Sequence, residues 1–194
     1  MRSRKVAIAR HCRKGPAHAY PAIRDGWPAG TRKQAPFAAV VSGDQQAYNT
    51  AKPALDGITD KAFHLGDFGV GTKMKFAANL LVGVHILATA EVLAMSAKVG
   101  LSHEQVIKIL SPSAAASLQF QVRAPMMAQK KWETALASVG LFLKDMETIA
   151  GFADDLGCPA PLIHTVRDYY ARAVDQGLSE KDVAAVYAVK SGVT

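Results

Sequence analysis

A long apolar run in the middle of the chain limits the folds that this sequence can adopt. From Phe76 to Ala97 almost every side chain is apolar, and the run is about as long as a bilayer is thick. It also contains Asn79, His85 and Glu91, with Glu91 well inside the run. Since ionisable groups are costly in lipid, we predict a buried helix of a soluble protein and no membrane span. A helix over residues 72–99 would be about 40 Å long, so other helices or a second subunit must surround it.

Helical signals continue from this run to the end of the chain. Ser102 and Gln105 have the spacing of a capping box, and glycines 100, 157 and 177 occupy positions where helices commonly stop. A Ser-Pro-Ser sequence at 111–113 is expected to break one helix and to cap the next. We predict five or six helices, over residues 72–99, 103–110, a segment carrying Leu118 to Met126, 138–156, 161–176 and 179–190.

The part before residue 71 has a different character. Residues 36–42 and 61–65 are predicted to be short strands, and residues 45–58 between them are predicted to form a helix with Asp44 as its N-cap. Pro53 is expected to kink that helix or to end it early. Residues 1–35 have no periodicity and are predicted to be irregular. The predicted domains are therefore a basic tail (1–35), a strand-helix-strand segment (36–70) and an all-helical domain (71–194).

The net charge of +7 comes from the tail. Residues 1–34 hold nine of the 23 basic residues and one of the 16 acidic residues, which leaves 14 basic and 15 acidic residues in the rest of the chain. Because the tail has few aromatic residues for base stacking, we do not expect a nucleic-acid partner. The two cysteines and six histidines have no metal-binding spacing, so no metal site is expected. No secretory signal is evident, and a cytoplasmic location is expected.

One short pattern at the start of the long helix indicates chemistry. Gly69 and Gly71 precede Lys75 and Asn79, whose i, i+4 spacing places them on one helix face about 6 Å apart along the axis. An amine beside an amide can hold and protonate an oxygen-rich substrate. The alternative is a helix start with two solvated lysines, Lys73 and Lys75.

The pattern G-x-G-x-x-x-K-x-x-x-N at the start of a long apolar helix resembles the β-hydroxyacid dehydrogenases, which include 3-hydroxyisobutyrate dehydrogenase, tartronate semialdehyde reductase and relatives of 6-phosphogluconate dehydrogenase. A second block agrees, with Lys144-Asp145 on a later helix that is followed by Gly157-Cys-Pro-Ala-Pro161. The resemblance covers about residues 36–193. It implies a mainly α fold: a helical bundle around one long helix, like the C-terminal domain of 6-phosphogluconate dehydrogenase, after a short α/β remnant of a Rossmann domain.

The resemblance also implies an activity and site residues. It makes Lys75 the catalytic acid/base for hydride transfer between NAD or NADP and a small 3-hydroxy acid. Asn79 would bind the substrate, and Lys144 would lie near the cofactor. Asp145 would orient or pair within its helix. The family's second domain is commonly dimeric, so a homodimer is expected.

A G-x-G-x-x-G turn, which binds the dinucleotide pyrophosphate in such enzymes, does not precede Pro36. We therefore expect a truncated or split form of such an enzyme. One hypothesis is that residues 1–35 are translated out of frame, and the genomic DNA sequence can test it. Two function classes remain open: an oxidoreductase half completed by another polypeptide, or a non-catalytic helical dimerisation module derived from the family.

Overall fold

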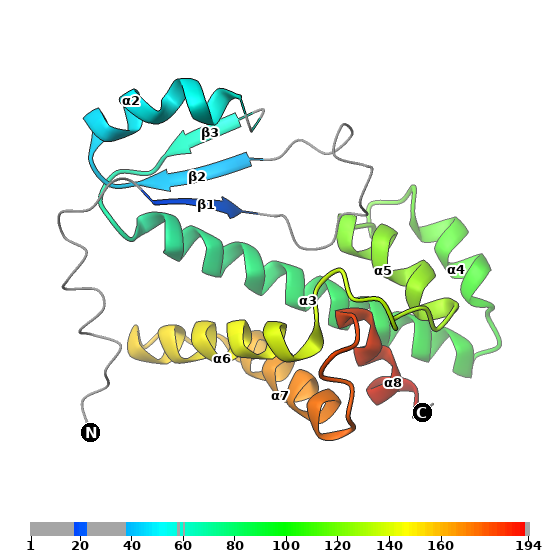
Figure 1. The fold of residues 1–194 in the computed structure, drawn as a ribbon. Helices are drawn as coiled ribbons and strands as arrows, with labels where there is room; N and C mark the ends of the chain where they lie inside the picture. Colours follow the sequence, from blue (N-terminus) through cyan, green and yellow to red (C-terminus); the bar gives the residue numbers. More distant parts are fainter. Residues whose placement is uncertain (1–17, 23–37, 58, 60, 193–194) are drawn as a thin grey trace. The chain divides into compact units, whose positions relative to one another are not determined.

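A computed structural model describes residues 18–22, 38–57, 59 and 61–192 (Figure 1). It divides into two compact units whose boundary falls between Ala78 and Asn79, inside helix α3 (Val70–Lys98). The first unit contains the sheet, helix α2 and the start of α3. The second contains the rest of α3 and all the later helices.

The first unit is built on a three-stranded sheet with the order β1-β2-β3. Strand β2 (Ala38–Ser42) is parallel to β3 (Lys61–His64), and α2 (Gln45–Asp56) connects them, as the sequence predicted. Strand β1 (His18–Ala22) pairs antiparallel with β2. This strand was not predicted, because a short segment that contains a proline and no alternation gives little local signal. As an edge strand, β1 can accommodate that proline.

Helix α2 packs on this sheet through a small core. Asp44 caps the helix, with its Oδ1 accepting from the Ala47 amide at 2.8 Å. Tyr48 and Leu55 pack against Val41 of β2, and the Tyr48 hydroxyl donates to the Ala62 carbonyl. The prediction that Pro53 ends the helix early is wrong, since α2 continues to Asp56. Pro53 lies near the C-terminal end of α2, so its missing N–H removes only one backbone hydrogen bond of the helix.

The regular elements in the described residues of the second unit are helices, apart from an isolated antiparallel bridge between Ser138 and Asp182, and most of these helices match the predicted ranges. Ser102 forms the predicted capping box with Gln105, and Ser138 caps α6. Figure 1 shows α6 and α7 packed side by side. The elements after α3 are α4 (His103–Leu110), α5 (Leu118–Ala128), α6 (Val139–Asp155), α7 (Pro161–Asp175), the 3-10 helix η1 (Val183–Ala185) and α8 (Val186–Ser191).

Two predicted helix starts are wrong. Helix α5 begins after Ser117, whose Oγ accepts from the Phe120 amide, and Ser113 instead closes a local turn with the Ala115 amide. The last helical segment begins after Asp182 and not at Ser179. Both errors have the same physical origin, because several residues nearby can serve as an N-cap and tertiary contacts decide which of them does.

Helix α3 packs closely against α6 and α7 at Gly83. A Cβ at this position would lie 2.9 Å from Val166 Cγ1 and 3.1 Å from Met146 Sδ, so a larger residue would force these helices apart. Ile86, Ala90 and Leu93 continue the buried face of α3. The close approach explains why a glycine stands in the middle of a long helix, where it otherwise costs stability.

Helix α3 also leaves apolar surface uncovered. By length and composition it could cross a membrane, but the core helix of a soluble protein passes the same test. Only 39% of its most apolar stretch is buried within the chain. Leu81, Met95 and Val99 are more than half exposed. The expectation that a helix this apolar must be surrounded is therefore only partly met within the described residues.

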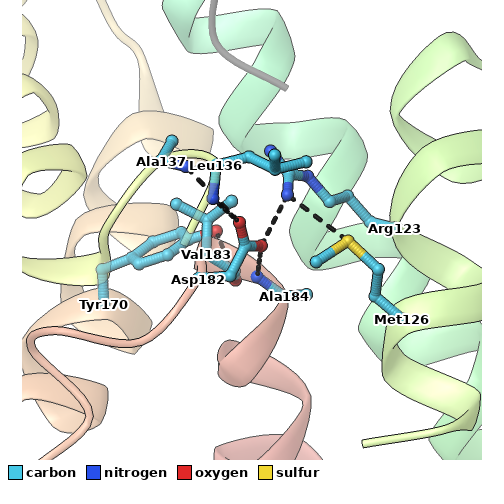
Figure 2. A network of polar contacts seen from close by, with 8 residues as sticks. All are labelled: Arg123, Met126, Leu136, Ala137, Tyr170, Asp182, Val183 and Ala184. Carbon is cyan, nitrogen blue, oxygen red and sulfur yellow. Dashed lines mark hydrogen bonds and ion pairs between the residues drawn. The ribbon is translucent and has the colours of Figure 1, made fainter. Parts of the chain in front are cut away.

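A buried ion pair connects α5, the loop before α6 and η1 (Figure 2). Arg123 Nη1 lies 2.6 Å from Asp182 Oδ1, and both side chains are almost completely buried. The other carboxylate oxygen of Asp182 accepts from the amides of Leu136 and Ala137. A buried carboxylate needs hydrogen-bond donors for its oxygens, and the donors to Asp182 come from α5, the loop before α6 and η1.

Candidate functional site

Lys75 lies in the second turn of α3, on a half-buried position. Among the described residues, its ammonium has no hydrogen bond or ion pair with another side chain. Lys73, two residues earlier, is exposed. The two lysines therefore differ in environment: a half-buried cation that no described side chain pairs with is available to a ligand, whereas an exposed one is mainly solvated.

Asn79 lies one helical turn after Lys75 and is also half-buried. Its Nδ2 donates to Asp145 Oδ2 at 3.1 Å, a contact between residues 66 positions apart. Asp145 is on α6, so the carboxylate pairs across to α3 and not within its own helix, contrary to one of the roles expected for it. The structure thus joins the two sequence blocks that carried the family resemblance.

The packing of α3 on α6 holds this contact in place. Met146 follows Asp145 on α6 and is completely buried, and it lies against Gly83, one turn after Asn79. Asn79 and Asp145 therefore face each other beside a tightly packed point of the interhelical contact. The absence of a Cβ at Gly83 permits the short distance between the two helices.

Lys144, the third predicted site residue, is exposed on α6, and its backbone carbonyl accepts from the Thr148 hydroxyl. Chain continuity places it next to Asp145, but within the part of the chain that the structure describes its amine makes no hydrogen bond or ion pair with Asn79. The described residues contain no group of three His, Cys, Asp or Glu side chains that could hold a metal ion. His85 is half-buried, with its carbonyl accepting from Thr89.

Sequence reasoning missed the Asn79–Asp145 hydrogen bond and the Arg123–Asp182 ion pair. Both connect residues that are far apart in the chain. A weak signal existed for the first, since an acidic residue predicted on a mostly apolar helix requires a partner. No comparable signal identified the partner of Arg123.

A family model described as NAD-binding of NADP-dependent 3-hydroxyisobutyrate dehydrogenase matches residues 69–190. The L-threonate dehydrogenase of Haemophilus influenzae is 30% identical over 156 residues, which cover 80% of this chain and 52% of that protein. The chloroplastic glyoxylate/succinic semialdehyde reductase 2 of Arabidopsis thaliana is 29% identical over 147 residues, covering 76% of this chain and 41% of that protein.

Solved structures agree with these relatives. The 3-hydroxyisobutyrate dehydrogenase of Salmonella typhimurium superposes with a TM-score of 0.81 at 27% identity, covering 89% of this chain and 59% of that one. The chain spans about half the length of the curated relatives it matches. The predicted fold, a helical region of this type after a short α/β remnant, is confirmed. The chain belongs to the β-hydroxyacid dehydrogenase family.

Proposed function

We propose that this chain supplies the catalytic lysine and the substrate amide of an NAD(P)-dependent oxidoreductase that acts on a small 3-hydroxy acid. One observation carries the proposal: Lys75 and Asn79 share a face of α3, and the Lys-Asp block of α6 meets that face at Asn79. Neither the block with Lys75 and Asn79 nor the Lys144-Asp145 block indicates this function by itself. The hydrogen bond from Asn79 to Asp145 connects the two blocks, and this connection supports the proposal.

When bound, NAD or NADP would supply the acceptor or donor of the hydride at the carbon that bears the hydroxyl group. The neutral amine of Lys75 accepts the hydroxyl proton as the alcohol is oxidised, and the resulting ammonium returns it in the reverse direction. Asn79 orients the oxygen for this transfer, and Lys144, which is exposed, would help to hold the cofactor. The role of this chain is thus to hold the oxygen and move its proton.

The described residues fit only part of the cofactor. A lysine amine and an amide suit the reacting end, where an oxygen gains or loses a proton. Gly69 and Gly71 are followed by Met74 where a G-x-G-x-x-G turn has its third glycine, so they do not make a pyrophosphate turn. We propose that the dinucleotide is bound mainly by a domain outside the printed sequence, in the same or another polypeptide. Residues 36–70 would be the remnant of that domain, with strand β1 (His18–Ala22) paired to it, and residues 71–194 would be the helical domain.

A second candidate function is a non-catalytic dimerisation module, and the uncovered apolar surface favours it. Within the second unit, a hollow lined by α3 and α7 residues includes Val84, Met95 and Leu162. Met95 is 62% and Leu162 57% exposed. Such a surface suits a second copy of the chain, and we propose a soluble, cytoplasmic homodimer. The two functions are compatible, because a catalytic half can also dimerise.

Joining this chain to the part of the Haemophilus influenzae L-threonate dehydrogenase that it does not match tests the enzyme proposal. The assay follows NADH or NADPH formation at 340 nm with L-threonate and with 3-hydroxyisobutyrate. Formation of reduced cofactor supports the oxidoreductase. A folded, dimeric fusion that binds NADH by fluorescence titration yet oxidises neither acid would support the non-catalytic module.

A further inference from the structure

Two side-chain atoms on helix α5 are buried without a hydrogen-bond partner among the described residues, namely Gln119 Oε1 and Arg123 Nε. Gln119 is 7% exposed and Arg123 is 1% exposed. Buried polar atoms of folded proteins are nearly always paired, either with protein groups or with ordered water, because an unpaired one is costly. The contacts between protein groups leave these two atoms unexplained.

The two residues are placed to share a partner. They are four positions apart on α5, so they lie on one face of the helix with their Cβ atoms about 5–6 Å apart. One atom is an unpaired donor and the other is an unpaired acceptor. A single group between them that both accepts and donates would therefore satisfy both.

The ion pair with Asp182 explains why Arg123 Nε has no protein partner. The guanidinium is a rigid planar fork whose N–H groups point in fixed directions. Its Nη1 donates to Asp182 Oδ1 at 2.6 Å and lies 3.5 Å from Met126 Sδ (Figure 2). The Nε–H points from the opposite edge of the fork, so the carboxylate bound at Nη1 does not accept from it.

The unpaired atoms also specify the chemistry of the shared partner. It must accept from Arg123 Nε–H and donate to Gln119 Oε1. A chloride ion accepts but cannot donate, and a metal cation or an ammonium group is repelled by the guanidinium. Because both atoms are buried, the partner must be small. Water meets these requirements, and buried waters with two or more polar partners are a normal part of protein interiors.

We propose that one buried water molecule binds between these side chains, accepting a hydrogen bond from Arg123 Nε–H and donating one to Gln119 Oε1. The water holds the edge of the guanidinium that Asp182 does not hold. It thereby extends the polar network of α5, the loop before α6 and η1 to Gln119. The proposal is independent of the proposed function, because neither side chain belongs to the candidate functional site.

A high-resolution crystal structure of the full chain tests the position of this water. We expect one density peak within hydrogen-bond distance, about 2.7–3.2 Å, of both Arg123 Nε and Gln119 Oε1. The peak should be lost in Gln119→Met, which keeps the side-chain length and removes the amide. It should be kept in Gln121→Met, which removes an amide from an exposed position on the same helix. A direct hydrogen bond from Nε to Oε1, or no peak between the two atoms, overturns the proposal.

The second measurement uses the wild-type chain in solution, so its main result does not depend on the folding of a variant. The Arg123 Nε–H resonance is assigned through its side-chain correlations to the backbone amide. A water held beside this proton gives a cross-relaxation peak at the water frequency, whose sign in the rotating frame is opposite to that of chemical exchange. We expect this peak in the wild type and in Gln121→Met, and its loss in Gln119→Met. A folded wild-type chain without the peak, or a folded Gln119→Met variant that keeps it undiminished, overturns the proposal.

Discussion

Replacing Gly83 by alanine tests the close packing that holds α3 against α6 and α7. The new Cβ would lie 2.9 Å from Val166 Cγ1, 3.1 Å from Met146 Sδ and 3.5 Å from Phe142 Cε1, where the first two distances are shorter than ordinary contacts. Overpacking of this kind costs about 1–3 kcal/mol of unfolding free energy. Alanine also gains about 1 kcal/mol over glycine inside a helix, which offsets part of that loss.

Gly151→Ala supplies the matched control, because Gly151 lies inside α6 and a Cβ there would meet nothing within 4 Å. The control should gain up to about 1 kcal/mol from helix propensity alone. The two variants should therefore differ by about 1–3 kcal/mol, with Gly83→Ala the less stable. Urea unfolding followed by circular dichroism at 222 nm measures the difference. Equal stabilities would refute the claim that α3 is in tight contact at Gly83.

Three further predictions concern the buried ion pair, a buried tyrosine and the apolar surface. Asp182→Ala and Arg123→Ala should each lower the unfolding free energy by about 3–5 kcal/mol in urea unfolding, because each leaves a buried charge unpaired. The double variant should lose less unfolding free energy than the sum of the two single losses. Burial raises the pKa of Tyr170, with the Arg123 guanidinium opposing this and Asp182 adding to it. The contribution of protonated Tyr170 to the free energy of unfolding is complete below the unfolded pKa of about 10 and is lost as the pH rises above that value. Absorbance at 295 nm should therefore report the Tyr170 phenolate only when the chain unfolds. Met95→Glu with Leu162→Glu should convert a dimer to a folded monomer in analytical ultracentrifugation, and a double variant that remains dimeric would place the interface elsewhere.

Features that depend on neighbouring residues could be predicted from the sequence. The Ser102–Gln105 capping box and the Asp44 cap involve residues three positions apart, so the local sequence contains both partners. The apolar length of α3 likewise follows from composition alone. In each of these cases the interactions that stabilise the element lie within a few residues of one another.

Features set by distant contacts could not be predicted in the same way. Asp182 begins η1, and not Ser179, because its carboxylate is held by Arg123, which is 59 residues away. Asp145 accepts a hydrogen bond from Asn79, which is 66 residues away. Strand β1 depends on pairing with β2, which its own residues do not signal. The proposed catalytic lysine and the amide were found from a motif, whereas the carboxylate that accepts from the amide required the structure.

The most direct measurement compares Lys75→Met with Lys73→Met in the fusion with the part of the Haemophilus influenzae L-threonate dehydrogenase that this chain does not match. Both changes remove one positive charge from α3, two residues apart, but the proposal assigns the transfer of the hydroxyl proton to Lys75 alone. We predict that kcat for hydroxy-acid oxidation falls by about 10²–10⁴ in Lys75→Met and stays near the wild-type value in Lys73→Met. Equal rates in the two variants would contradict the assignment of Lys75 as the acid/base of this protein.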